Sequence, residues 1–141
     1  MNIHLDFETR SKANLKKEGM FRYSEDSSTL VLCAAYCIDD SAIQLWRPGQ
    51  PIPSELRNAI ENRAVVYAHN AGFELLIWNN VLRRDYPKLP RLNIDQMRDT
   101  AAMAAAMGLP RSLEHASLAL KLKTQKEISG KSLIKQLCQL Q

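Results

Sequence analysis

Residues 2–8 read NIHLDFE, and this stretch decides the fold that we expect and the first candidate site. Apolar and polar side chains alternate from Asn2 to Phe7, which is typical of a β-strand with one buried and one polar face. Asp6 and Glu8 therefore project from one face, while Phe7 points into the core. Two carboxylates so close repel each other in a dry site unless a cation lies between them, and their oxygens favour Mg²⁺ or Mn²⁺. A strand end with two solvated acids is the alternative interpretation.

Further strands are expected along the chain. The apolar run Thr29–Ile38, the turn Asp39–Ser41 and the segment Ala42–Trp46 are typical of a β-hairpin. Ala64–Ala68 predicts a short buried strand, and Leu92–Met97 predicts another. A hairpin followed by alternating strands and helices indicates an α/β fold, with a mixed sheet and helices packed against it.

Helices are expected where apolar residues recur at helical spacing after a capping residue. These segments are 54–62, 70–84, 100–108, a stretch from 112 onward, and 129–140. The expected caps are Ser54, Asn70, Asp99 and Ser112. The polar segment Arg10–Asp26 predicts a loop or a short helical turn.

Length and composition exclude several classes of protein. The chain has 141 residues, 45% hydrophobic and 24% charged, which fits one folded domain spanning residues 1–141. Because no apolar run approaches the ~20 residues that cross a bilayer, we expect no membrane partner. The start of the chain reaches an acid too soon for a signal peptide. Three cysteines without metal-ligand spacing fit a reducing compartment, so we expect a cytoplasmic location.

The net charge of +4 is unevenly distributed. Residues 1–70 carry eight basic and nine acidic side chains, whereas residues 71–141 carry eleven and six, which gives −1 and +5. A local basic excess favours a polyanionic partner. A solvated helix face explains the same lysines without a partner.

A second segment, HNAGFE at residues 69–74, lies where an expected strand leads into a helix. One interpretation needs no chemistry: Asn70 caps the helix, and Glu74 in the first turn complements the helix dipole. In the other interpretation, Glu74 is a third carboxylate that faces Asp6 and Glu8 across the edge of the sheet.

Together, three segments resemble a known family. DFET at 6–9, HNAGFE at 69–74 and DTAAMAAAMGLPRSLEHASLAL at 99–120 are similar to the DnaQ-like (DEDD) 3′–5′ exonucleases, above all to the proofreading domain of phage-type family A DNA polymerases. The resemblance extends roughly from Asn2 to Cys138. It implies a ribonuclease H-like fold, in which a mixed sheet begins with an antiparallel meander and is flanked by helices.

The resemblance also implies a catalytic site that binds two Mg²⁺ or Mn²⁺ ions through Asp6, Glu8 and Glu74. Asp6 would bridge the two ions, Glu8 would hold the ion that activates the attacking water, and Glu74 would reach the second ion. In the family, an aspartate usually stands at the position of Glu74. Asn70 and Phe73 match the pattern N-x-x-[FY]-[DE], and together with Thr9 they would contact the terminal nucleotide. The implied substrate is single-stranded DNA or a 3′ DNA end, with RNA as a further possibility.

The family's fourth acid is missing from this sequence. It belongs to a Y-x-x-x-D or H-x-x-x-x-D pattern, but Tyr86 is followed four places on by Pro90, and His115 five places on by Leu120. We therefore expect an exonuclease-like domain that is truncated on its C-terminal side and weakened. A second copy or a partner subunit would complete its site. Asp99 is the best-placed substitute, although its position favours a helix cap.

A module of another class remains as the alternative. Such a module would retain the exonuclease fold but be catalytically inactive, and it would bind nucleic acid or a protein.

Overall fold

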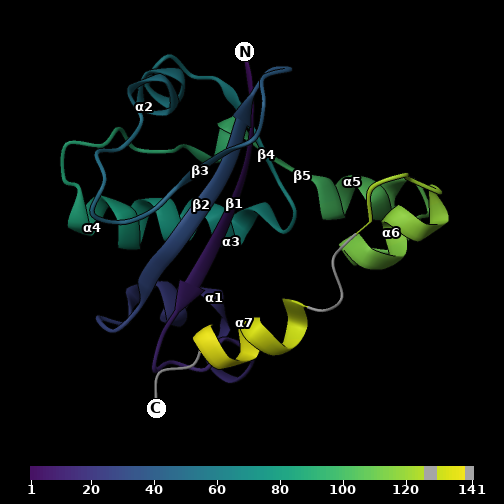
Figure 1. Cartoon of the computed structure of the whole chain (residues 1–141), viewed down its shortest axis with the longest axis horizontal. Helices are drawn as coiled ribbons and strands as arrows, with labels where there is room; N and C mark the ends of the chain where they lie inside the picture. The colour runs from purple at the N-terminus through teal and green to yellow at the C-terminus, as the bar shows by residue number, and fades with distance from the viewer. Residues whose placement is uncertain (126–129, 139–141) are drawn as a thin grey trace.

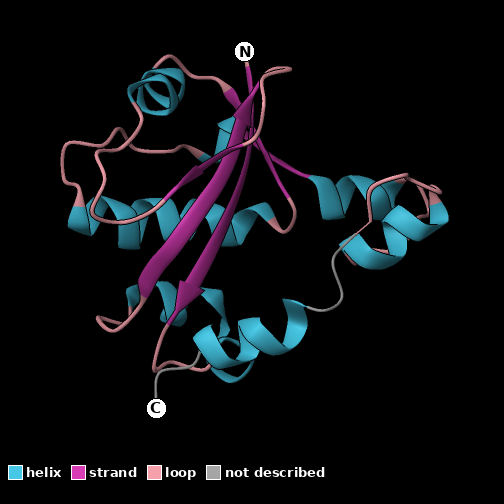
Figure 2. Cartoon of the chain, viewed as in Figure 1, coloured by secondary structure: helices cyan, strands magenta, loops and turns pink. Residues whose placement is uncertain are grey.

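The computed structural model describes residues 1–125 and 130–138. Its strands form one mixed sheet in the order β3-β2-β1-β4-β5 (Figures 1 and 2). The antiparallel pairs are β1–β2 and β2–β3, and the parallel pairs are β1–β4 and β4–β5. This arrangement confirms the expected ribonuclease H-like α/β class. The strands are β1 (Asn2–Arg10), β2 (Leu30–Ile38), β3 (Gln44–Trp46), β4 (Val65–Ala68) and β5 (Met97–Asp99).

Helices connect and flank these strands. The segment expected as one helix over 70–84 is an α-helix, a π-helical stretch and a short α-helix in direct succession. No helix in the described part of the chain is long and apolar enough to cross a membrane. The helices are α1 (Leu15–Glu25), α2 (Ser54–Glu61), α3 (Ala71–Leu76), η1 (Ile77–Leu82), α4 (Arg83–Asp85), η2 (Ile94–Gln96), α5 (Thr100–Ala106), α6 (Leu113–Ala119) and α7 (Gly130–Cys138).

The hydrophobic core lies on one face of the sheet. Ile3, Leu5 and Phe7 of β1 are buried there, as the alternation predicts. Figure 1 shows α3 and α4 passing behind the strands on this side, where Trp78 and Val81 of η1 are completely buried. Burial of each large apolar side chain contributes about 1.5–3 kcal/mol relative to exposure, so this layer sets the register of β1.

The opposite face of the sheet is largely open. His4 and Asp6 are exposed on it. Helices α5 and α6 extend beyond β5 as a separate lobe, and α7 lies near the end of β1 (Figure 1). The backbone N–H of Ser11 donates to the Cys138 carbonyl oxygen at 3.2 Å, which attaches the end of α7 to the end of β1.

Three local predictions differ from the structure. The segment Arg10–Asp26 contains the helix α1, because the Asn14 side chain caps it at the N–H groups of Lys16 and Lys17. The expected strand Leu92–Met97 is the short helix η2, followed by β5. Ser54 is the first residue of α2 and not its cap, since Pro53 takes that position without a side-chain hydrogen bond.

We predict that Phe7→Ala lowers the free energy of unfolding by about 3–5 kcal/mol, because it removes a buried ring between the two outward-facing acids. Phe7 is 4% exposed, whereas Phe21 on α1 is 58% exposed and provides the matched control. Urea unfolding of both variants measures the difference. An equal loss of stability in Phe7→Ala and Phe21→Ala would contradict the assigned face of β1.

Candidate functional site

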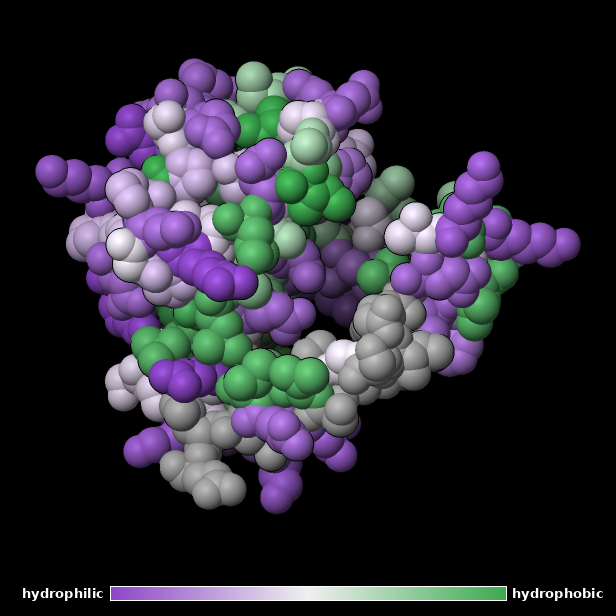
Figure 3. All heavy atoms as spheres, viewed as in Figure 1, coloured by the Kyte–Doolittle hydropathy of each residue, from purple (hydrophilic) through white to green (hydrophobic). Residues whose placement is uncertain are grey.

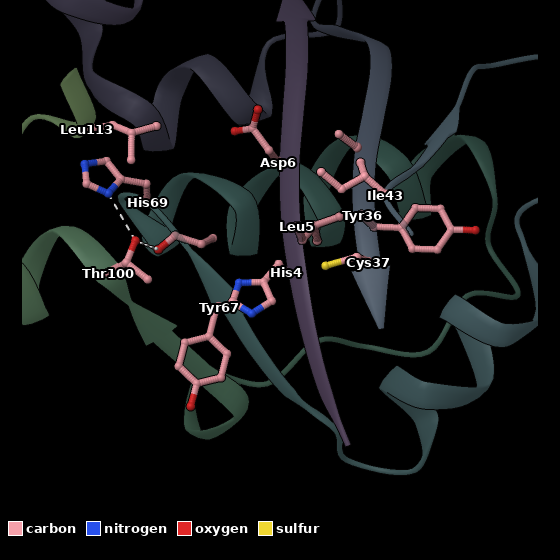
Figure 4. Close-up of a pocket in the computed structure, with 12 residues that line it drawn as sticks. His4, Leu5, Asp6, Tyr36, Cys37, Ile43, Tyr67, His69, Thr100 and Leu113 are labelled. Carbon is pink, nitrogen blue, oxygen red and sulfur yellow. Dashed lines mark hydrogen bonds between the residues drawn. The ribbon is translucent and has the colours of Figure 1, made fainter. Parts of the chain in front are cut away.

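The register of β1 places Asp6 and Glu8 on the open face of the sheet. Asp6 pairs with Ala35 of β2, and Glu8 pairs with Cys33. The Asp6 carboxylate projects toward the side of β1 on which His69 and Leu113 lie (Figure 4). Asp6 is exposed and Glu8 is half-buried, so the strand presents two acids at different depths.

A cavity of about 300 Å³ opens beside Asp6. The ring of His4 stacks on that of Tyr67, with centroids 5.2 Å apart, and forms one wall (Figure 4). In Figure 3 the surface is hollowed between the sheet and the lobe of α5 and α6, with hydrophilic side chains inside. This cavity is lined by residues of β1, of β4 and the turn after it, and of the α5–α6 lobe. They include His4, Asp6, Tyr67, His69, Thr100 and Leu113.

Glu74 reaches the same region from the other side of β1. Strand β4 pairs with β1 only along Asn2–His4, so the next part of this edge of β1 has no partner strand in the described sheet. Helix α3 begins directly after β4, and its first turn brings Glu74 to this edge, where the backbone N–H of Phe7 interacts with its carboxyl group. Glu74 is 3% exposed.

Burial makes Glu74 an unusual acid. Desolvation, and to a smaller extent the charges of Asp6 and Asp99, raise its pKa to about 8. The backbone N–H groups of Glu74 itself and of Phe7 act in the opposite direction. Within the described residues, its Oε2 atom is buried and has no hydrogen-bond partner. An unsatisfied buried oxygen is costly, and such atoms mark candidate functional groups.

Glu8 lies further along β1, near α1 and the end of α7. It acts to raise the pKa values of the Tyr23 hydroxyl and of the Cys33 and Cys138 thiols, although desolvation is the larger cause in each case. Because these groups come from three different elements, Glu8 lies where β1, β2, α1 and α7 meet.

The residues expected to contact a nucleotide are divided between the core and a second cavity. The Thr9 hydroxyl is buried and lies 2.8 Å from the Tyr23 hydroxyl, with which it shares a hydrogen bond. The ring of Phe73 lies 6.0 Å from that of Tyr23. Phe73 and Asn70 line a cavity of about 570 Å³, together with Leu15, Met20, His69, Gly72, Asp99 and Arg111.

Helix α1 contributes to this cavity, which the sequence did not predict. Its Met20 packs so closely on Gly72 that a β-carbon at Gly72 would lie 3.2 Å from the Met20 methyl group. Tyr23 supports both Thr9 and Phe73. Asn14 was the available signal, since Asn is a favoured N-cap and its Oδ1 atom accepts from the N–H groups of Lys16 and Lys17.

Asn70 does not cap α3 as expected. Its backbone is left-handed, with φ 68° and ψ 52°, and its side chain makes no capping hydrogen bond. Instead, its N–H donates to Asp99 Oδ1 at 3.0 Å. Asn tolerates this conformation better than most residues do, which explains why it stands between β4 and α3.

Asp99 is a structural cap, as its position favoured. Its Oδ1 atom accepts from the N–H groups of Ala101 at 2.9 Å and Ala102 at 3.4 Å, in addition to that of Asn70. Desolvation acts to raise the pKa of Asp99, but these hydrogen bonds outweigh it and lower the pKa. An acid held by several N–H groups is a poor substitute for a missing metal ligand.

His69 also has a structural role, because it joins the end of β4 to the α5–α6 lobe. Its Nε2 atom lies 2.6 Å from the Arg111 carbonyl oxygen, and its Nδ1 atom lies 3.0 Å from Thr100 Oγ1 (Figure 4). Since a carbonyl oxygen only accepts, Nε2 carries a proton.

The carboxylates of the described residues provide some, but not all, of the features of a site for a hard cation. Among residues 1–125 and 130–138, no group of three or more His, Cys, Asp or Glu side chains is positioned to hold a metal ion. Asp6 and Glu74 interact electrostatically, and the unpartnered Glu74 oxygen is a donor of the kind that Mg²⁺ and Mn²⁺ prefer.

The chain is similar to part of a known protein. No protein-family model matches the chain. A DNA polymerase of Bacillus phage SP02 is 32% identical to it over 136 residues, which cover 94% of this chain and 20% of that polymerase. The chain therefore spans about a fifth of the length of this curated relative, and it is similar to a segment of a phage DNA polymerase.

We predict that Glu74→Gln alters the pH dependence of stability. The pKa of Glu74 rises from 4.5 to about 8 on folding. Between these pH values, Glu74 is protonated in the folded state but ionised in the unfolded state, so rising pH favours unfolding. Stability of the natural protein should fall as pH rises from about 4.5 to about 8. At pH 8.5, Glu74→Gln should be more stable by roughly 3–5 kcal/mol, and at pH 4 the two should be similar.

Urea unfolding across this pH range measures the effect, with the exposed Glu61→Gln on α2 as the control. Parallel pH profiles for the natural protein and Glu74→Gln would show that burial does not raise the pKa of Glu74.

We predict that Asp99→Ala costs about 1–2 kcal/mol of stability, because it leaves the N–H groups of Asn70 and Ala101 without their acceptor. Asp99→Asn should retain most of that stability, since an amide oxygen also caps a helix. Thermal or urea unfolding compares the two variants. If both lost stability equally, the capping role would be wrong and the negative charge would be what matters.

Proposed function

We propose that this chain is a metal-dependent 3′–5′ exonuclease-like domain that hydrolyses terminal phosphodiesters of DNA. One observation carries the proposal: the Glu74 carboxyl group is buried, has an unpartnered oxygen and lies within electrostatic reach of Asp6 on the open sheet face. Folding alone gains nothing from a buried carboxyl oxygen that has no hydrogen-bond partner. A divalent cation between the two carboxylates would remove that penalty. The similarity to a phage DNA polymerase supports the same function.

In this proposal, Asp6 and Glu74 hold the cation. Glu8, further along β1, provides an additional carboxylate ligand. Bound Mg²⁺ or Mn²⁺ would supply Lewis-acid stabilisation of the charge that develops on the phosphodiester during in-line attack by water. Glu74 must lose its proton to bind a cation, so cation binding should strengthen as pH rises toward 8.

The terminal nucleotide is proposed to lie between the two cavities beside the carboxylates. Phe73, Met20 and Leu15 offer an apolar wall against which a base can pack, next to Asn70. Thr9 would act through Tyr23, because its hydroxyl is already bonded there. The similarity to a DNA polymerase makes DNA the proposed substrate. RNA of the same length serves as the alternative substrate for comparison. Such a function implies a cytoplasmic location, where strand ends are available.

A fourth ligand is proposed to come from outside the described residues, for example from a second copy or a partner subunit. The nearest candidate in this chain, Asp99, is held by backbone N–H groups. The same observation favours the second candidate function, in which the chain binds single-stranded nucleic acid or a protein through the same face but does not hydrolyse a phosphodiester.

We predict slow, metal-dependent removal of 3′-terminal nucleotides from a 5′-labelled single-stranded DNA. Asp6→Ala should reduce the rate at least 100-fold, because it removes the exposed carboxylate beside Glu74. Asp95→Ala is the matched control: Asp95 is exposed and forms an ion pair with Arg63 away from the site. Gel analysis with Mg²⁺, Mn²⁺ or EDTA follows the product ladder, and RNA of the same sequence tests substrate preference.

Loss of nucleotides that persists in Asp6→Ala would contradict the proposed site. Binding of the labelled strand without any metal-dependent shortening would support the second candidate function instead.

A further inference from the structure

A third cavity lies at another part of the sheet and shares no lining residue with the two cavities beside the carboxylates. Its volume is about 430 Å³. It is formed where β1 ends, next to β2, β3 and α4. Two arginines line it together with an aromatic and aliphatic wall: Arg10, Arg47, Trp46, Tyr86, Leu32 and Leu82.

Arg10 lines this cavity with a guanidinium group that is not fully paired within the described protein. It is the last residue of β1, and its Nε atom is buried without a hydrogen-bond partner among the described residues. Arg10 as a whole is half-buried, so part of its side chain borders the cavity. An anion in the cavity would offset the charge of the guanidinium group and accept hydrogen bonds from it.

Arg47 connects this cavity to the carboxylate face. It directly follows Trp46, the last residue of β3, and Trp46 pairs with Ala34 of β2. The neighbour of Ala34 in β2 is Cys33, which pairs with Glu8 of β1. Arg47 therefore lies at the level of Glu8 along the sheet.

The one acid in the cavity lining is already engaged. Asp85 accepts from Arg84 Nε at 3.1 Å, while Arg84 also donates to the Thr29 carbonyl oxygen. A neighbouring cavity of about 360 Å³ shares Asp85 and Tyr86 and adds Arg57 and Lys88. Positive charge thus continues along this edge of the molecule, away from Asp6.

We propose that Arg10 and Arg47 form a phosphate-binding site for a DNA strand, at an internal phosphodiester on the 5′ side of the terminal nucleotide. The assignment of this phosphate to a strand whose end lies at Asp6 and Glu74 rests on the proposed function. Arginine recognises phosphate with several N–H donors at once, and the flanking Tyr86 ring offers a surface for a neighbouring base. A strand rises about 3.3 Å per residue, so Arg10 lies roughly 13 Å along β1 from Asp6. Only a strand of several nucleotides can reach both sites.

Binding of fluorescent dT12 and dT2, and competition by dTMP, test the proposal. Measurements in EDTA exclude hydrolysis. Arg47→Met and Arg10→Met keep an apolar stem but remove the guanidinium group, and Arg91→Met, at an exposed position outside these cavities, is the control with the same change in charge. We expect each cavity variant to weaken dT12 binding about three- to tenfold and to reduce the salt slope by about 0.7. Affinity for dT2, and dT12 binding by Arg91→Met, should stay unchanged.

Besides an unchanged dT12 affinity, two other results would overturn the proposal. One is an equal loss of dT12 affinity in Arg91→Met, which would indicate an unspecific effect of charge. The other is a loss of dTMP competition in the cavity variants with dT12 affinity preserved, which would indicate a site for a free nucleotide. Because Arg10 is partly buried, the exposed Arg47→Met keeps the test valid if Arg10→Met does not fold.

The test of the phosphate site can be distinguished from the test of exonuclease activity. Asp6-dependent hydrolysis together with unchanged dT12 affinity in Arg47→Met would overturn the phosphate site alone. Guanidinium-dependent dT12 binding without any hydrolysis would overturn the exonuclease activity and leave the phosphate site in place.

Discussion

The packing of one face of β1 against the helix layer is the constraint on which the rest of the structure depends. Ile3, Leu5 and Phe7 are buried between the sheet and η1. A shift of one residue in the pairing would place these apolar groups in solvent and the acids in the core. The exposure of Asp6 on the open face is therefore a direct consequence of hydrophobic burial on the other face.

The short length of β4 has the next largest effect on the site. Because its pairing with β1 stops at His4, the edge of β1 beside Phe7 is available to α3, and Glu74 enters there. The acid is held in a dry position next to another carboxylate, which raises its pKa to about 8. A buried carboxyl group in such a position lowers the stability of the folded protein, a cost that is common at functional sites.

Most of the sheet could be predicted from local patterns, and so could the helix caps Asp99 and Ser112. The expected caps Ser54 and Asn70 were wrong. The period-two alternation of β1 and the apolar run of β2 identify their strands because each pattern is complete within one segment. Asn70 was expected to cap α3, but its side chain makes no capping bond and its N–H donates to Asp99, 29 residues away. Helix α1 was missed because it is mostly exposed and is interrupted at Gly19, whose φ of 81° breaks the helical geometry. Asp99 was placed correctly, since its capping bonds lie within three residues of it.

The sequence by itself determined which side chains share a face of β1 and where the strands β1 to β4 lie. It also showed three carboxylates, Asp6, Glu8 and Glu74, in an order that resembles a known family. These properties follow from the two-residue period of a strand and from residue identity, so no distant contact is needed to read them. Tertiary structure alone decided that Glu74 is buried beside Asp6, that Tyr23 supports Phe73, and that Arg10 and Arg47 line one cavity. Each of these depends on how elements far apart in the chain pack together, and burial and electrostatic coupling exist only once that packing has formed.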